Sequence, residues 1–354
     1  MNLDDLTIYP PLDPQNMLAE INGLADQLAA AWELGQTQPL PTPAQISRVV
    51  IAGMGGSAIG ADLLTAYIEP LCPVPVIVQR DYTLPAWATG PDTLVIASSH
   101  SGNTEETLSA FEQALERKCT ILVVATGGKL AKRAAETNTP MFTFTHKGQP
   151  RAAVGYSFGL LLAAFTRLGL IPDPRAELDD ALAAMRVAQA QWKIEIPTMQ
   201  NAAKRQAGQL MGRWVSVFGS EILVPVARRW KGQVSELAKA WGQFEFLPEA
   251  DHNSLAGLVQ PEGVFGNMIA MFLIAPSYHP RNTLRGELTK KAFMLEGVST
   301  DFFIARGETR LAQQWTTLLF GDYMAYYLAI AYGIDPTPIP ALEAFKAEMA
   351  DTEK

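Results

Sequence analysis

The chain has 354 residues, of which 48% are hydrophobic and 18% are charged, so it can form substantial apolar cores and is not a disordered polypeptide. Its 36 acidic and 28 basic residues give a formal net charge of −8, which argues against a general attraction for nucleic acid or anionic lipid. The acidic start of the chain lacks a secretory signal, and no apolar run is long enough for a membrane span. We therefore expect a cytoplasmic protein with no membrane or nucleic-acid partner.

The first half of the chain alternates predicted strands with predicted helices. Apolar spacing predicts a helix over 16–34, and a Pro-rich linker follows from 39 to 43. Strands are then predicted over 48–52, 74–78, 93–97, 120–125 and 141–145, and helices over 57–67, 104–117 and 130–137. This alternation indicates a parallel sheet with helices on both faces.

The second half repeats the pattern less regularly. Residues 168–180, rich in Pro and Asp, predict a junction between two domains. Further helices are predicted over 182–191, after 197, over 311–331 and at the end of the chain, and strands over 214–219, 244–246, 268–274 and 301–305. The strand–Gly-Ser–helix order that begins at 214 predicts a second α/β unit related to the first.

A glycine-rich loop follows the first predicted strand. It reads Gly-Met-Gly-Gly-Ser-Ala-Ile-Gly over 53–60 and opens a helix. Glycines let the backbone approach a ligand closely, and a helix N-terminus offers free N–H groups to an anion. The spacing also approximates a dinucleotide fingerprint, and Asp81 near the end of the next strand keeps a nucleotide-dependent oxidoreductase as an alternative.

A second loop, at the end of the strand predicted over 93–97, carries three hydroxyls. Ser99, Ser101 and Thr104 lie in the run Ser-Ser-His-Ser-Gly-Asn-Thr-Glu-Glu-Thr over 98–107. Hydroxyls and backbone N–H groups can satisfy phosphate oxygens without a cation. A helix cap, the alternative interpretation, needs only one hydroxyl, so three hydroxyls around a Gly favour a phosphate ligand.

The second loop resembles the phosphosugar loop of the sugar isomerase (SIS) domain. With four further segments, it makes the chain similar to the bifunctional phosphoglucose/phosphomannose isomerases. These segments are the glycine-rich loop, the run from Gln149 to Tyr156, the run from Glu249 to Asn253 and the Asp-Pro-Thr-Pro at 335–338. The resemblance implies an α/β fold with two SIS-type domains, each a flavodoxin-like, three-layer arrangement of a parallel sheet flanked by helices. The implied divisions are an N-terminal helix and linker (1–45), a first, phosphate-binding SIS domain (46–170), linker helices (171–200), a second SIS domain (201–335) and a C-terminal helix that completes the active site (336–354).

The resemblance also implies roles for individual residues. The phosphate would be held by Gly56, Ser57, Ser99, Ser101 and Thr104. Glu236 would be the catalytic base and Arg151 would steady an enediolate, while His252, donated by the partner subunit of a homodimer, would help to open the sugar ring. Lys346 matches the family's C-terminal active-site lysine.

The sequence departs from the family pattern at two of these places. Leu237 follows Glu236 where the family usually has Asn, and Ser254 stands two positions after His252 where the family usually has an acidic or amide residue. A non-catalytic phosphosugar-binding SIS protein, or an SIS isomerase for another phosphosugar, therefore remain alternatives to the isomerase interpretation.

The leading hypothesis is an isomerase that interconverts glucose 6-phosphate and/or mannose 6-phosphate with fructose 6-phosphate through a cis-enediol. This reaction needs one base that removes and returns a proton, and a carboxylate in a partly desolvated pocket suits that role. The four histidines (His100, His146, His252 and His279) are scattered, so the sequence predicts neither a metal site nor a cofactor. His100 lies inside the phosphate loop and either contacts substrate or points into solvent.

Overall fold

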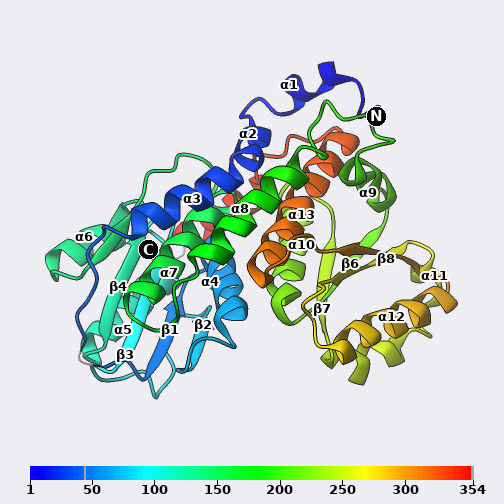
Figure 1. Ribbon diagram of the computed structural model, residues 1–354. Helices are drawn as coiled ribbons and strands as arrows, with labels where there is room; N and C mark the ends of the chain where they lie inside the picture. Colours follow the sequence, from blue (N-terminus) through cyan, green and yellow to red (C-terminus); the bar gives the residue numbers. More distant parts are fainter. Residues whose placement is uncertain (44, 352–354) are drawn as a thin grey trace.

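The computed structural model describes residues 1–43 and 45–351, and it places them around two parallel β-sheets (Figure 1). Residue 44, in the predicted linker, and residues 352–354, at the end of the predicted C-terminal helix, lie outside the described residues. In the described part of the chain, no helix combines the length and the apolar character that a bilayer crossing requires.

The first sheet has the strand order β2-β1-β3-β4-β5, and all of its pairs are parallel. This is the flavodoxin-like order of a doubly wound sheet. Side chains alternate between its faces. Val49 and Ile51 join the core formed with α3 (Leu24–Gly35), α4 and α7, while Val50 and Ala52 join a core formed with α5 and α6. The elements are β1 (Arg48–Ala52), α4 (Gly55–Ile68), β2 (Val76–Gln79), β3 (Thr93–Ser99), α5 (Glu105–Glu116), β4 (Thr120–Ala125), α6 (Gly128–Glu136), β5 (Met141–Thr143) and α7 (Val154–Arg167).

The second sheet has the order β7-β6-β8-β9 and is also parallel throughout. One of its faces packs on α9, α10 and α13, and the other on α12 through Phe218, Phe272 and Phe293. The elements are α9 (Ala202–Leu210), β6 (Trp214–Ser220), α10 (Val224–Glu236), β7 (Gly242–Leu247), α11 (Glu262–Phe265), β8 (Met268–Ile274), α12 (Pro280–Leu295), β9 (Ser299–Ile304), α13 (Arg310–Tyr332) and α14 (Pro340–Asp351). Short 3₁₀ helices are η1 (Leu6–Ile8), η2 (Pro150–Ala152), η3 (Glu221–Leu223), η4 (Glu249–His252) and η5 (Ser254–Gly257).

Helix α13 is the element that joins the two halves of the molecule. Its side chains are buried from Leu311 to Ala331, and it packs against α8, α9 and α10. Figure 1 shows it, in orange, beside α10 and between the two sheets. A helix buried on all sides belongs inside a core, and here one cluster of buried apolar residues runs from the first sheet through α7, α8 and α13 to the second.

The structure corrects two predictions about helices. The helix predicted over 16–34 is broken into α2 (Met17–Asn22) and α3 (Leu24–Gly35), with Gly23 between them, and the short α1 (Tyr9–Leu12) precedes both. The helix predicted over 182–191 begins too late, because α8 (Arg175–Gln189) begins directly after Pro174, inside the segment predicted as a junction. A proline is compatible with the start of a helix, where its missing N–H would have no intrahelical partner.

Candidate active site

The two predicted ligand loops meet at the carboxyl edge of the first sheet. The chain adds β2 on one side of β1 and then β3, β4 and β5 on the other side, so the strand order reverses at β1. Open α/β sheets bind ligands in the crevice at such a switch point. The glycine-rich loop leaves β1 and the hydroxyl loop leaves β3. The backbone N–H of His100 donates to Ser57 Oγ at 3.1 Å and ties one loop to the other.

Within the hydroxyl loop, two of the three predicted hydroxyls face each other. Ser99 Oγ lies 2.9 Å from Thr104 Oγ1 and accepts the backbone N–H of Gly102 at 3.1 Å. Thr104 stands at the N-cap of α5, but its hydroxyl is directed to Ser99 and not to the start of the helix. Ser101 is exposed, and its Oγ accepts the backbone N–H of Asn103 at 3.2 Å. This arrangement does not match a simple helix cap.

Gly56 brings the N-terminus of α4 against the segment that carries Arg151. A Cβ atom at Gly56 would lie 2.4 Å from the carbonyl oxygen of Pro150 and 3.3 Å from the backbone nitrogen of Arg151. Contacts this short exclude any side chain at position 56 unless the backbone moves. The glycine therefore sets how closely the first helix of the site approaches the predicted arginine.

Arg151 and Glu236 are brought together across a cavity. Their Nη1 and Oε2 atoms lie 3.7 Å apart, and both residues line a cavity of about 330 Å³ together with Gly55 and Gly56. Arg151 is 4% exposed, and burial lowers the pKa of its guanidinium, an effect that the Glu236 carboxylate opposes. Of the described residues, none hydrogen-bonds its buried Nε atom. Ser99, Ser101 and Thr104 lie outside the lining of this cavity.

A buried charge network holds the helix that carries Glu236. Arg229 of α10 donates to Asp322 of α13 from Nε at 3.0 Å and from Nη2 at 2.6 Å, and Gln233 donates to the same carboxylate at 2.9 Å. Arg229 Nη2 also donates to the carbonyl oxygen of Arg151 at 3.1 Å. Burial raises the pKa of the Asp322 carboxyl, and the charge of Arg229 opposes this. The network fixes Glu236 and Arg151 to one scaffold.

The Asp-Pro-Thr segment at 335–337 closes the other side of the pair. Arg151 Nη2 donates to the carbonyl oxygens of Pro336, at 2.9 Å, and Thr337. Lys239 Nζ donates to the carbonyl oxygen of Asp335 at 2.7 Å and to those of Glu236 and Leu237, each at 3.1 Å. The ammonium therefore ties the end of α10 to this segment. Burial, and then the charge of Arg151, lower the pKa of Lys239 to about 8.

Cationic side chains dominate the lining of the Glu236 cavity. In the described chain its charged lining residues are Glu236 and five cations: Arg80, Arg151, Arg228, Arg229 and Lys231. Arg80 and Arg228 share the carboxylate of Asp62, with Arg228 Nη1 at 2.8 Å. A pocket of this sign favours an anionic ligand although the whole chain is negatively charged.

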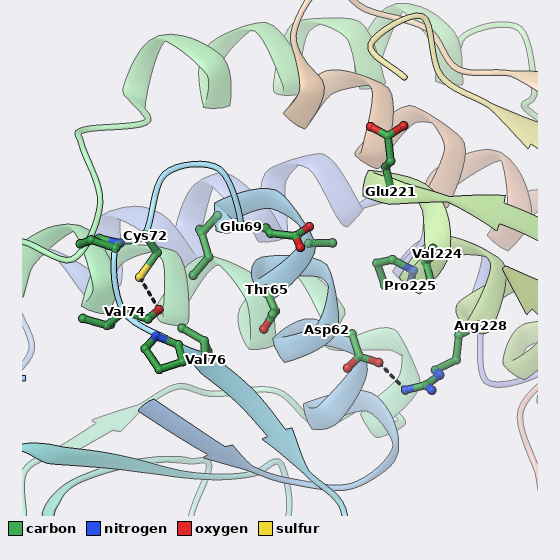
Figure 2. Close-up of a pocket in the computed structure, with 14 residues that line it drawn as sticks. Asp62, Thr65, Glu69, Cys72, Val74, Val76, Glu221, Val224, Pro225 and Arg228 are labelled. Atoms are coloured by element: carbon green, nitrogen blue, oxygen red, sulfur yellow. Dashed lines mark hydrogen bonds and ion pairs between the residues drawn. The ribbon is translucent and has the colours of Figure 1, made fainter. Parts of the chain in front are cut away.

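A larger cavity of about 640 Å³ lies on the other side of Asp62 and Arg228. Figure 2 shows it between α4, the segment that leads into β2 and the start of α10, with Glu69, Cys72 and Glu221 on its walls. Of the described residues that line it, none belongs to the predicted site. The predicted residues Arg151 and Glu236 meet instead at the smaller cavity.

Two predicted site residues do not join the others within this chain. His252 is exposed at the end of η4, and Lys346 is exposed on α14. Among residues 1–43 and 45–351, no hydrogen bond or ion pair links either side chain to Glu236 or Arg151. Within the single chain, Arg151 and Glu236 therefore come together without these two residues, of which His252 was expected from a partner subunit.

Comparison with known proteins identifies the family. The SIS domain model matches residues 44–160, and the model of the bacterial phospho-glucose isomerase C-terminal SIS domain matches residues 199–349. The bifunctional phosphoglucose/phosphomannose isomerase of Caldicellulosiruptor bescii is 37% identical over 95% of this chain and 99% of its own length. The chain belongs to the bifunctional phosphoglucose/phosphomannose isomerase family.

A second relative agrees with this assignment, and a solved structure agrees with the fold. The Aquifex aeolicus member of the same isomerase family is 32% identical over 85% of this chain and 90% of its own. Among solved structures, the C-terminal domain of a glucosamine-fructose-6-phosphate aminotransferase from Francisella tularensis superimposes with a TM-score of 0.72 at 15% identity, covering 91% of this chain and 98% of that chain. At this identity the likeness supports the fold, two parallel sheets flanked by helices, and nothing further.

Sequence reasoning missed the residues that hold the candidate site together. The role of Lys239 could have been predicted, because a lysine three positions after Glu236 can donate to the last carbonyl oxygens of a helix. Arg229 and Asp322 are 93 positions apart, and neither belongs to a motif. Only the packing of α10 on α13 reveals their pairing.

Proposed function

We propose that this protein interconverts glucose 6-phosphate and mannose 6-phosphate with fructose 6-phosphate. The observation that carries the proposal is the pair formed by Glu236 and Arg151 in a cationic cavity beside the N-terminus of α4. Relatives that are named for phosphoglucose and phosphomannose isomerase activity support the choice of substrates. The phosphate would be held by the N–H groups at Gly56 and by the hydroxyls of Ser57, Ser99, Ser101 and Thr104.

The proposed chemistry is a proton transfer through a cis-enediol. Glu236 removes the proton from C2 of the open-chain aldose and returns it to C1, while the C1 oxygen gains a proton and the C2 oxygen loses one. Arg151 faces the negative charge that develops on these oxygens. Its burial makes that interaction stronger than it would be in water. No metal takes part in this scheme, and activity after exhaustive treatment with a chelator tests that point.

We further propose that a second copy of the chain completes the site. Helix α14 carries Leu342, Phe345 and Met349 with exposed fractions of 45%, 61% and 42%, at a spacing that places them on one face. An apolar face of this kind on a helix that also bears Lys346 supports a homodimer in which α14 and His252 reach a partner's cavity. Light scattering of the wild type and of Phe345→Glu tests this, because loss of the dimer should reduce turnover.

The decisive experiment is the Glu236→Gln variant. Turnover of both hexose phosphates should fall by about 10²- to 10⁴-fold, the usual contribution of a general base, while the Kd for fructose 6-phosphate changes little. Glu69→Gln, in the larger cavity, is the matched control and should retain activity.

A reaction in D₂O completes the test. Solvent deuterium at the transferred position would support the enediol, whereas complete retention of the substrate's hydrogen would indicate a hydride shift. Full activity of Glu236→Gln would remove the proposed base.

A further inference from the structure

Three ionisable side chains from distant parts of the chain form one hydrogen-bonded series behind the hydroxyl loop. His100 Nε2 lies 3.0 Å from His146 Nδ1, and His146 Nε2 lies 3.1 Å from Glu20 Oε2. Glu20 belongs to α2, His146 to the segment between β5 and η2, and His100 to the loop after β3. The series therefore joins three segments that are far apart in the sequence.

The middle of the series is buried, and its Glu20 end is partly exposed. The His146 side chain is 7% exposed and that of Glu20 is 32% exposed. The ring of Phe144 lies edge-on to His100 at 5.8 Å, and Tyr156, the other titratable ring that faces the series, lies 6.1 Å from His146. Even the backbone is close, since a Cβ atom at Gly148 would lie 2.7 Å from Glu20 Oε1. Hydrogen bonds in such surroundings are less exchanged with water than surface contacts.

The chemistry of the three groups fixes where the protons lie. A carboxylate can only accept a hydrogen bond, so Nε2 of His146 must donate to Glu20. When the His146 ring carries a single proton, its Nδ1 can only accept, so the proton of His100 then lies on Nε2. Burial, and then the neighbouring His146, lower the pKa of the His100 imidazole to about 4, which keeps that ring neutral near pH 7. Glu20 thus sets the tautomer of both rings.

The end of the series lies inside the site. His100 stands between Ser99 and Ser101, its N–H donates to Ser57 Oγ, and its carbonyl oxygen accepts Thr126 Oγ1 at 2.6 Å. His146 precedes Arg151 by five positions, so the same series also anchors the segment that leads to the arginine.

We propose that Glu20 and His146 are positioning residues for phosphosugar binding, which act by holding His100 and with it the hydroxyl loop. The inference rests on the proposed phosphosugar function of that loop. Its consequence is specific: breaking the series at Glu20, the end farthest from the loop, weakens binding and leaves the proton-transfer step nearly unchanged. A residue that only stabilised the fold would lower the melting temperature without this separation.

The test compares Glu20→Ala with Glu20→Gln. Glu20→Ala should raise both the KM and the directly measured Kd for fructose 6-phosphate about fivefold, the effect of losing one hydrogen bond, with kcat within twofold of wild type. Glu20→Gln keeps an acceptor oxygen and should restore most of the affinity. Asp26→Asn, on the neighbouring α3 with a 78% exposed carboxylate, is the matched control and should behave as wild type.

A second readout does not depend on activity. Nitrogen-15 spectra of the four imidazoles at pH 7 should show His100 and His146 as Nε2–H tautomers in the wild type and as mixtures in Glu20→Ala. If Glu20→Ala fails to fold, His146→Gln replaces it with the same expectations for KM and kcat. Unchanged Kd and unchanged tautomers would overturn the inference, as would a loss confined to kcat. Wild-type protein that binds fructose 6-phosphate but does not turn it over would instead contradict the proposed function alone.

Discussion

Removing the carboxylate of Asp322 should destabilise the protein more than any surface change. Asp322 is 2% exposed and its partner Arg229 is 4% exposed, so Asp322→Ala would leave a guanidinium inside the core without its counterion. Breaking a buried pair in this way costs about 3 to 5 kcal/mol, a large fraction of the ~5–15 kcal/mol by which folded proteins are stable. The melting temperature should fall by on the order of 10 °C.

The assay is urea unfolding followed by tryptophan fluorescence, with two comparison variants. The double variant Arg229→Met/Asp322→Leu removes both charges and should recover part of the loss, though not all of it, because the carbonyl oxygen of Arg151 also loses a donor. Asp179→Ala breaks an exposed pair with Arg175 and should cost about 1 kcal/mol or less. If Asp322→Ala cost no more than Asp179→Ala, the reasoning from burial would be refuted.

Three further predictions address the site. The pKa of His100 is about 4 in the folded chain and ordinarily 6.5, so the unfolded chain takes up the proton first as pH falls. The free energy of unfolding should therefore drop by about 3 kcal/mol between pH 6.5 and 4. In urea titrations His100→Gln should lose less stability over this pH range, whereas His279→Asn, which keeps its capping acceptor, should behave as wild type. Gly56→Ala should weaken fructose 6-phosphate binding at least tenfold by calorimetry, because its Cβ would meet the carbonyl oxygen of Pro150, and unaltered affinity would contradict the close approach of α4 to that carbonyl. Activity should decline above pH 8, because the Lys239 ammonium, which three carbonyl oxygens hold, loses a proton there. Lys239→Arg should move this decline to higher pH. An identical pH profile in that variant would exclude Lys239 as the origin of the decline.

Much of the fold follows from local patterns in the sequence. The strand predicted over 48–52 matches β1, and those predicted over 120–125 and 268–274 match β4 and β8, because buried parallel strands are short continuous apolar runs. The start of α8 was missed because Pro174 and the acidic residues after it are typical of a loop as well as of a first helical turn. Composition cannot separate these two cases, and the packing of α8 on α13 decides between them.

The geometry of the candidate site was predictable where one short loop forms it. Ser99 and Thr104 are close in sequence, and the loop brings their hydroxyls together as expected. The pairing of Arg151 with Glu236 joins residues from the two halves of the chain and rested on resemblance to a family. The contact between His100 and His146 had no signal in the sequence, because it depends on how the segment after β5 folds back over the edge of the sheet.

The continuous apolar core around α13 limits how the protein can move. No plane separates the two sheets without cutting through buried side chains, so swinging one half away from the other would expose apolar surface to water. A hinge motion of whole halves is therefore too costly to admit substrate on each catalytic cycle. Substrate exchange must therefore proceed with both halves fixed, through the open side of the cavity that Arg151 and Glu236 line.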